Sequence, residues 1–247
     1  MNNQISLDKL KELKLTGMAK AYEAILTMPV HEQPNYQIVV NRLIEAEQLY
    51  RQQKRTNLYF RLSKLRYNSV IEQVICNTVR NLSSDQLAAV ADCSYIDRTE
   101  NILITGATGC GKSYLACALG RQACTLGYRV YYFGMSRLME KISLSKLDGT
   151  YIKLINNIAK TDLFILDDFG IYPLDTITRL SLLQILEDRY GLKSTMIISQ
   201  LPTENWYEYI AELTLADAIL DRLFARAHRF DLKGDSGQIY FLGSKQI

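Results

Sequence analysis

Apolar residues in the first part of the chain recur three or four positions apart, and this spacing is typical of amphipathic helices. The recurring positions are Leu7, Leu10, Leu13, Leu15, Leu43, Ile44, Leu49, Leu58, Leu62 and Leu65. Almost no stretch here alternates between apolar and polar residues as a strand does. Gly17, Pro29 and Pro34 interrupt the pattern and predict turns between the first helices. We therefore expect a small all-α N-terminal domain over residues 1–97.

The hydrophobic pattern changes at Asn101. Short apolar runs now alternate with amphipathic stretches, and the runs read NILIT, RVYYF, DLFIL, STMIIS and QIYFL. Short apolar runs separated by helical segments predict a parallel sheet covered by helices. We assign residues 98–247 to an α/β domain with a five-stranded parallel sheet.

Composition narrows the functional classes. The chain has 247 residues, of which 48% are hydrophobic, and this is enough for a packed core. Its net charge of +3 gives no global sign of a nucleic-acid partner, so any such surface must be local. The N-terminus mixes Lys and Glu with apolar residues, unlike a signal peptide, and no run is long enough to cross a bilayer. We expect a soluble, cytoplasmic protein with no membrane partner.

The segment ILITGATGCGKSYLACALG carries the most specific motif of the chain. It matches the P-loop pattern, with Lys112 and Ser113 between a predicted strand and a predicted helix. Its glycines let backbone N–H groups surround a phosphate, and the helix N-terminus adds positive charge. Lys112 can reach the outer phosphates, and the Ser113 hydroxyl can coordinate Mg²⁺. The predicted nucleotide-binding residues are Gly106, Ala107, Thr108, Gly109, Cys110, Gly111, Lys112, Ser113 and Tyr114.

A second motif, LFILDDFG, ends an apolar run with two adjacent aspartates. Adjacent carboxylates repel each other, and a divalent cation beside the first relieves that repulsion. We predict that Asp167 holds Mg²⁺ and that Asp168 is the catalytic base for the attacking water. A pair of solvated turn aspartates is the alternative. The letters DFG also occur in protein kinases, but the H-R-D and G-x-G-x-x-G motifs of that family are missing.

The run STMIISQLP predicts another strand that ends in Ser199 and Gln200. If this strand neighbours the one carrying Asp167, its polar end lies near the γ-phosphate. We therefore assign Ser199 a catalytic sensor role. Ordinary capping of the strand end is the alternative, because Ser is common at such positions.

Three arginines follow an apolar helical pattern in ADAILDRLFARAHRFDL. An arginine that one subunit supplies to the phosphoryl group bound by another raises turnover strongly. Arg222 is the first candidate, and Arg226 and Arg229 are further candidates at such an interface. The alternative is that these residues only solvate the outer face of a helix.

A local basic stretch without acidic residues lies between Tyr50 and Tyr67. Its cations are interleaved with Tyr59 and Phe60, and this composition is typical of a surface that follows phosphates. A solvated helix face is the alternative. The candidate DNA-binding residues are Arg51, Lys54, Arg55, Arg61, Lys64 and Arg66.

Taken together, these motifs resemble those of the AAA+ ATPases, and most closely the IstB and DnaC branch. The resemblance is carried by GATGCGKSYLACALG, DLFILDDFGIYPLD, LLQILEDRYGLKSTMIISQLPTENWYEYI and ADAILDRLFARAHRFDLKGDS, and it extends to LKLTGMAKAYEAIL and RQQKRTNLYFRLSKLRY. It implies an ATPase that assembles into homo-oligomers on double-stranded DNA, remodels it, and stimulates a cognate transposase. It also implies that Arg222 is the arginine finger, and it favours DNA as the partner of the basic stretch.

The chain departs from the AAA+ pattern at two points. Most members have Glu where this chain has Asp168, which is one methylene shorter. Few residues follow Arg222, so we expect no C-terminal lid domain. Two other functions stay open: a DnaC-like loader of a replicative helicase, and a P-loop kinase acting on a small metabolite.

Overall fold

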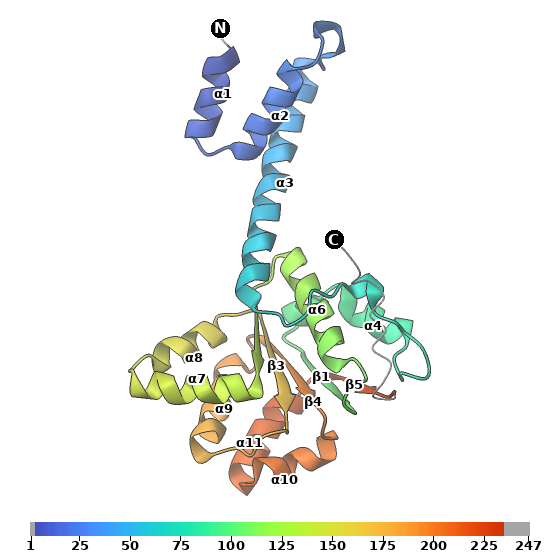
Figure 1. Ribbon diagram of the computed structural model, residues 1–247, viewed down its shortest axis with the longest axis vertical. Coiled ribbons are helices and arrows are strands. Elements are labelled where there is room, and N and C mark those ends of the chain that lie inside the picture. The colour runs from blue at the N-terminus through green and yellow to red at the C-terminus, as the bar shows by residue number, and fades with distance from the viewer. Residues whose placement is uncertain (1–2, 235–247) are drawn as a thin grey trace. The chain divides into compact units, whose positions relative to one another are not determined.

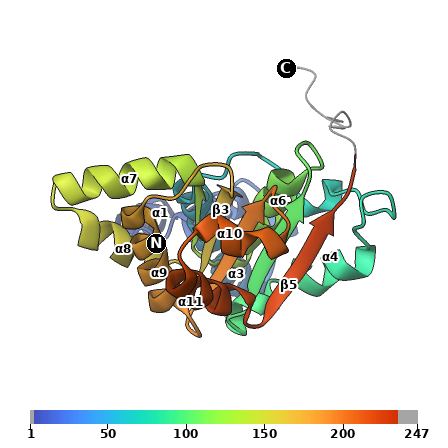
Figure 2. The same cartoon turned by 90° about the horizontal axis from the view of Figure 1, so that it is seen from below.

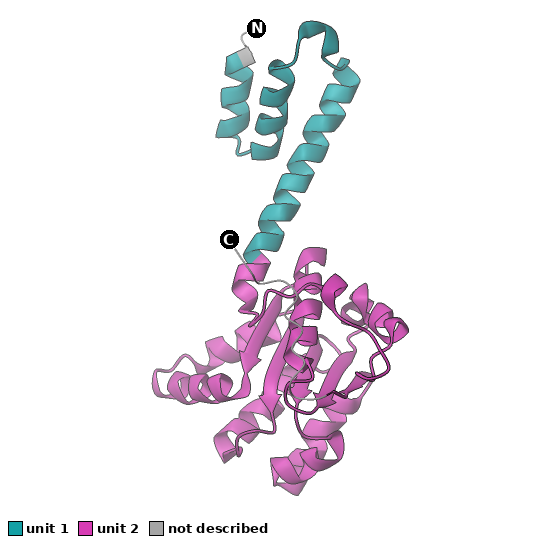
Figure 3. Ribbon diagram, turned by 45° about the vertical axis from the view of Figure 1, so that its right-hand side comes forward, with its two compact units in different colours: residues 1–58 teal, residues 59–247 magenta. Residues whose placement is uncertain are grey.

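The computed structural model describes residues 3–234 and divides the chain into two compact units, Met1–Leu58 and Tyr59–Ile247 (Figures 1 and 3). The boundary lies inside a helix, whereas the sequence led us to expect it between residues 97 and 98. The reason is burial: Leu82, Val90 and Tyr95 are fully or almost fully buried in a core that they share with the sheet. Residues 59–97 therefore belong to the second unit.

The first unit is helical, as predicted. Its elements are α1 (Asn3–Glu12), α2 (Thr16–Leu26), the short η1 (Val30–Glu32) and the part of α3 (Tyr36–Ser63) up to Leu58. Gly17 lies inside α2 rather than in a turn. A glycine is needed there because α3 approaches closely: a Cβ on Gly17 would lie 2.3 Å from the Ala46 carbonyl oxygen. The buried Glu47 carboxylate accepts hydrogen bonds from the amides of Gly17 and Met18, and so caps α2 from α3.

The second unit contains a five-stranded sheet in the order β2-β3-β4-β1-β5, and every neighbouring pair is parallel. This confirms the predicted sheet. The strands are β1 (Asn101–Gly106), β2 (Val130–Gly134), β3 (Leu163–Phe169), β4 (Ser194–Ser199) and β5 (Ala227–Leu232). The sequence placed the fifth strand at QIYFL, residues 238–242, which lie outside the described residues; the fifth strand of the described sheet is β5 instead.

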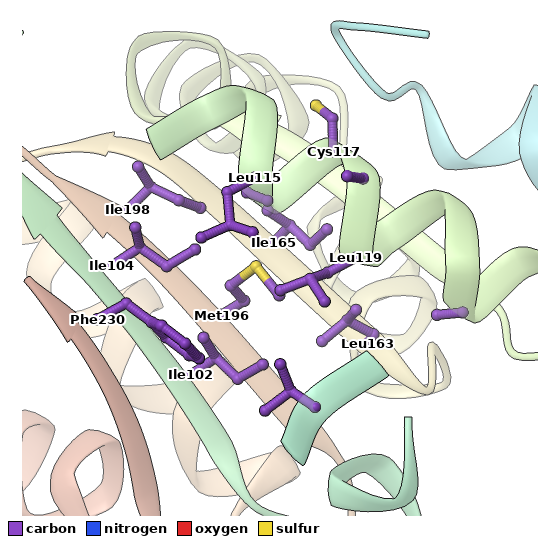
Figure 4. Packing of buried hydrophobic residues seen from close by; sticks show 14 of the residues in the cluster. Ile102, Ile104, Leu115, Cys117, Leu119, Leu163, Ile165, Met196, Ile198 and Phe230 are labelled. Atoms are coloured by element: carbon purple, nitrogen blue, oxygen red, sulfur yellow. The ribbon is translucent and has the colours of Figure 1, made fainter. Parts of the chain in front are cut away.

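Helices cover both faces of the sheet (Figures 1 and 2). They are η2 (Ile71–Gln73), α4 (Ser84–Ala91), α5 (Ser94–Asp97), α6 (Lys112–Leu126), α7 (Met135–Leu147), α8 (Tyr151–Ala159), α9 (Thr176–Arg189), η3 (Thr203–Asn205), α10 (Trp206–Ile210) and α11 (Leu213–Phe224). Figure 4 shows Leu115 and Leu119 of α6 packed on Ile104, Ile165 and the other apolar side chains of one face. Each such buried side chain stabilises the fold by about 1.5–3 kcal/mol.

Because all five strands are parallel, their carboxyl ends lie at one edge of the sheet. Ligands of open α/β sheets bind at that edge, so it is the place to look for the nucleotide. No helix among the described residues is long and apolar enough to cross a membrane. The expected lack of a lid concerns a region that the described residues only partly cover, and it stays a prediction.

Candidate nucleotide-binding site

The loop between β1 and α6 wraps tightly because its glycines adopt backbone conformations with positive φ that other residues rarely adopt. Gly106 has φ +139°, and a Cβ there would lie 2.1 Å from the Leu232 carbonyl oxygen of the neighbouring strand. Gly111 has φ +89° and directly precedes α6. Arg80 supports this loop from outside, because its guanidinium donates a hydrogen bond to the Cys110 carbonyl at 3.0 Å. The loop therefore has the geometry that a P-loop requires.

Lys112 is the first residue of α6, and its side chain returns over the loop. Its Nζ donates hydrogen bonds to the carbonyl oxygens of Gly106 and Ala107, each at 2.7 Å, and the residue is only 8% exposed. An ammonium group held at the loop carbonyls lies where the outer phosphates of a bound nucleotide are contacted. The structure thus places Lys112 where the sequence predicted it.

Asp167 and Asp168 lie at the end of β3, in different environments. Asp167 is 1% exposed; its carboxylate accepts a hydrogen bond from the Tyr132 hydroxyl at 2.6 Å and another from the Asp168 amide at 2.8 Å. Asp168 is more exposed and adopts φ +62°, where the β3–β4 register shifts. Burial and then the Asp167 charge raise the pKa of Asp168, and Arg66 and Lys112 oppose that rise only in part. The Asp167 carboxylate is therefore held in place by hydrogen bonds, whereas the more exposed Asp168 carboxylate is free to change its orientation.

These groups converge on a cavity of about 320 Å³. The predicted residues that line it are Thr108, Gly109, Gly111, Lys112, Ser113, Tyr114, Asp167, Asp168 and Ser199. Arg66, Tyr67, Ile198 and Gln200 complete the lining. The structure therefore brings the P-loop, the acidic strand end and the β4 strand end together in one site.

The donor set of this cavity suits Mg²⁺ that arrives with a nucleotide. Ser113 supplies a hydroxyl and Asp167 a carboxylate, and Mg²⁺ typically takes one or two protein ligands together with phosphate oxygens and water. No cluster of three or more His, Cys, Asp or Glu side chains that could hold a metal occurs within residues 3–234. The residues fit a nucleotide-borne metal ion better than a resident one.

Ser199 lines the cavity, but its hydroxyl is hydrogen-bonded to the backbone of the protein. It is fully buried; its hydroxyl donates to the Phe169 carbonyl at 2.6 Å and accepts from the Leu201 amide at 3.0 Å. The first bond joins the ends of β3 and β4, and the second caps the end of β4, which agrees with the strand-end alternative. Gln200, the next residue, accepts a hydrogen bond from the Thr108 hydroxyl of the P-loop. A sensor role for Ser199 stays a prediction.

Arg222 lies outside the nucleotide cavity. Its guanidinium donates to Glu187 at 2.9 Å and to the Ala218 carbonyl at 2.6 Å. It lines a second cavity of about 210 Å³, together with the cations Arg189, Lys193 and Arg226. The two cavities share none of their lining residues. Within one chain, Arg222 is therefore not placed to contact a nucleotide held by Lys112. Arg229 instead lies over the Phe224 ring at 4.8 Å.

All six candidate DNA-binding cations are exposed. Arg51, Lys54 and Arg55 lie on α3 in the first unit, and Arg51 forms an ion pair with Glu47 at 2.7 Å. In the second unit, Arg66 departs from the expected pattern, because its guanidinium lies 3.6 Å from the Asp168 carboxylate. The sequence grouped this arginine with its basic neighbours and missed its place in the nucleotide cavity.

Tyr132 is a second residue that the sequence missed. Burial and then the Asp167 charge raise the pKa of Tyr132, so its hydroxyl stays protonated and donates to Asp167. Its position next to the acidic strand follows from the β2–β3 pairing, in which Gly134 is opposite Asp167. No sequence motif marks that pairing. Knowledge of the strand order would have been needed to find it.

Comparison with known proteins identifies relatives along nearly the whole chain. The family model described as IstB-like ATP binding protein matches residues 8–240. A putative insertion sequence ATP-binding protein of Sinorhizobium fredii is 42% identical over 231 residues, which cover 94% of each chain. The putative ATP-binding protein of insertion sequence IS1162 from Pseudomonas fluorescens is 36% identical over 204 residues, covering 82% of this chain and 88% of the relative.

Solved structures share the fold at lower identity. A DnaI structure matches with a TM-score of 0.57 and 18% identity, covering 67% of this chain and 92% of that chain. The DnaC helicase loader matches with a TM-score of 0.56 and 19% identity, covering 68% and 98% of the two chains. At these identities the matches establish the AAA+ P-loop fold and nothing beyond it.

Proposed function

The chain belongs to the family of IstB-like ATP-binding proteins, and from that membership we propose that it is an ATP-hydrolysing helper of DNA transposition. In this proposal it binds double-stranded DNA, forms homo-oligomers on it with ATP, remodels it, and stimulates a cognate transposase. One observation carries the proposal. A complete P-loop cavity, with Lys112 and Ser113 opposite Asp167 and Asp168, occurs in a chain whose insertion-sequence relative matches it over 94% of both lengths.

In this proposal, several residues of the cavity have distinct tasks. The P-loop amides and Lys112 would hold the phosphates, and Ser113 and Asp167 would hold Mg²⁺. When bound, Mg²⁺ neutralises charge that develops on the β- and γ-phosphate oxygens. Tyr132 fixes the Asp167 carboxylate through its 2.6 Å hydrogen bond. Asp168, which is not fixed in this way, orients the attacking water and takes its proton.

We expect Asp168→Asn to lower the rate of ATP hydrolysis by about 10²- to 10⁴-fold while ATP binding changes little, because a neutral amide cannot accept the proton. Single-turnover hydrolysis and equilibrium binding of ATP measure the two effects separately. Asp168→Glu is the matched control, since it keeps the carboxylate and should retain most of the activity. Loss of ATP binding in Asp168→Asn would contradict the division of labour between the two aspartates.

The exposed cations of the basic stretch support DNA as the partner. Phosphate contacts bind duplexes of any sequence, which suits a protein that engages many target sites. No ion pair among the described residues involves Lys54, Arg55 or Arg61, so their charges are free to meet phosphates. Binding through such contacts releases counterions and weakens as salt rises.

Replacing Lys54, Arg55 and Arg61 with Gln should weaken duplex binding and reduce the slope of log affinity against log salt by about 3, because each phosphate that is no longer neutralised lowers the slope by about 0.9. Fluorescence anisotropy with a random-sequence duplex at several salt concentrations measures this slope. The matched control replaces the exposed Lys9, Lys11 and Lys14 with Gln, which changes the net charge equally. Equal effects in both variants would show that total charge, and not the basic stretch, governs binding.

Sedimentation velocity with ATP and a short duplex tests the proposed function as a whole. Large assemblies that require both ligands, together with stimulation of a cognate transposase, are the expected result. Capture of a replicative helicase, but not of a transposase, would indicate the loader function instead. A monomer that ignores duplex and phosphorylates a metabolite would indicate the kinase alternative.

A further inference from the structure

The segment after α3 runs along α6 toward the nucleotide cavity, and we call residues 64–69 the strap. Near its start, Leu65 packs over Gly120, where a Cβ would lie 2.9 Å from a Leu65 methyl group. At its end, the Ser69 hydroxyl donates to the Tyr114 carbonyl at 3.1 Å. Because Tyr114 precedes Gly120 on α6, the strap and α6 run in opposite directions. The strap therefore leads from the end of α3 to the P-loop end of α6.

Arg66 lies in the middle of the strap and points into the nucleotide cavity. Its guanidinium is 3.6 Å from the Asp168 carboxylate and 5.4 Å from the Tyr67 ring. About half of the Arg66 side chain is exposed, so it can leave this position without unfolding the core. The anchors on both sides, Leu65 and Ser69, fix the backbone and leave the side chain as the movable part.

We infer that Arg66 is a positioning residue that holds the Asp168 carboxylate away from the attacking water, and that DNA phosphates release the carboxylate by taking this guanidinium. At 3.6 Å the two groups form an ion pair and not a hydrogen bond, and their attraction keeps the carboxylate turned toward the guanidinium and away from the water. Arg66 thus acts on the reaction only through Asp168. The inference rests on the proposed function, because it takes ATP hydrolysis and DNA binding as given.

In this inference, exposed cations beside Arg66 bring DNA phosphates close to it. Arg61 and Lys64 are exposed cations at the end of α3 and at the start of the strap. A duplex that is held by these two side chains brings its phosphates close to the strap. One guanidinium cannot fully serve both a phosphate and Asp168, so the two acceptors compete for it. Because of this competition, DNA binding favours the release of Asp168, and the release of Asp168 favours DNA binding to the same extent.

The first test is steady-state ATP hydrolysis by Arg66→Gln with and without duplex. Without duplex, kcat should rise about three- to fivefold with little change in KM, which is the scale of one partly exposed ion pair. Stimulation by duplex should fall by the same factor. Arg66→Lys should return kcat toward the original value, because it keeps the charge. A lower kcat, or an unchanged kcat with unchanged stimulation, would overturn the inference.

Arg121→Gln is the matched control. Arg121 is a half-buried cation that contacts the same part of the chain, through Asn68 and the Phe60 ring, but it does not line the nucleotide cavity. Its replacement should leave the basal kcat unchanged. If Arg121→Gln raised kcat as much as Arg66→Gln, the effect would come from a loosened strap and not from the contact with Asp168.

The second test needs no hydrolysis. With a non-hydrolysable ATP analogue, Asp168→Asn should raise duplex affinity a few-fold, because Arg66 becomes free for phosphates. In an Arg66→Gln background the same substitution should have no effect, and an equal rise in both backgrounds would overturn the inference. The basal kcat measurement stands even if wild-type protein does not respond to duplex, and the affinity measurement stands even if it does not hydrolyse ATP. Failure of the proposed function is therefore distinguishable from failure of the role of Arg66.

Discussion

Lys112→Ala should abolish nearly all ATP hydrolysis, with a loss of at least about 10²- to 10³-fold, the scale of removing one preorganised donor to a developing negative charge. The Nζ atom lies 2.7 Å from two P-loop carbonyls, so the ammonium is already located at the phosphate cradle. Alanine removes that charge and leaves the loop amides without their cationic partner. ATP affinity should fall as well, because the proposed contact of Lys112 with the phosphates is already made in the ground state.

Titration calorimetry with ATP and a phosphate-release assay measure these two effects. Thermal unfolding of the variant must be followed in parallel, because the Lys112 side chain is buried and also ties the loop together. Lys160→Ala is the control: this exposed lysine directly follows α8 and does not line the cavity. Hydrolysis within about tenfold of the original rate would contradict the assignment of Lys112 to the phosphates.

Most of the fold and the centre of the site could be predicted from local patterns. The P-loop depends on glycines that directly precede a lysine and a serine, and β3 depends on an apolar run that ends in two aspartates. In both cases neighbouring residues in the sequence determine the geometry. The structure confirms the parallel five-stranded sheet and brings Lys112, Ser113, Asp167 and Asp168 into one cavity.

The remaining features depend on contacts between distant parts of the chain. Arg66 reaches Asp168 because the strap packs against α6, and no local pattern encodes that packing. The unit boundary differs from the expected one for the same reason, since Leu82 and Val90 pack into the core of the sheet-containing unit. The sequence analysis did not predict β5, because AHRFDL alternates only partly between apolar and polar residues and carries charged residues, as an edge strand does.

The largest loss is expected for Arg222→Ala, in which turnover should fall by about 10³- to 10⁵-fold, the range found for arginine fingers. ATP binding should persist, because Arg222 does not line the cavity that contains Lys112. The bond to Glu187 holds the guanidinium on the surface formed by α9 and α11. At this place it does not line the cavity of its own chain, and we expect it to contact a nucleotide in another copy of the chain. Arg137→Ala is the control and should hydrolyse ATP normally, because Arg137 is exposed and lines neither cavity.

Mixing two inactive variants tests whether Arg222 acts between subunits. In an equal mixture of Arg222→Ala and Lys112→Ala, about a quarter of head-to-tail interfaces pair an intact P-loop with an intact arginine. Hydrolysis should therefore reappear in the mixture, at up to about a quarter of the original rate, although each variant alone is inactive. If the mixture stays inactive under conditions where both variants assemble, Arg222 acts within its own subunit. A site that is completed between subunits would then be the wrong description, and a P-loop kinase whose site is complete within one subunit would account better for the same cavity.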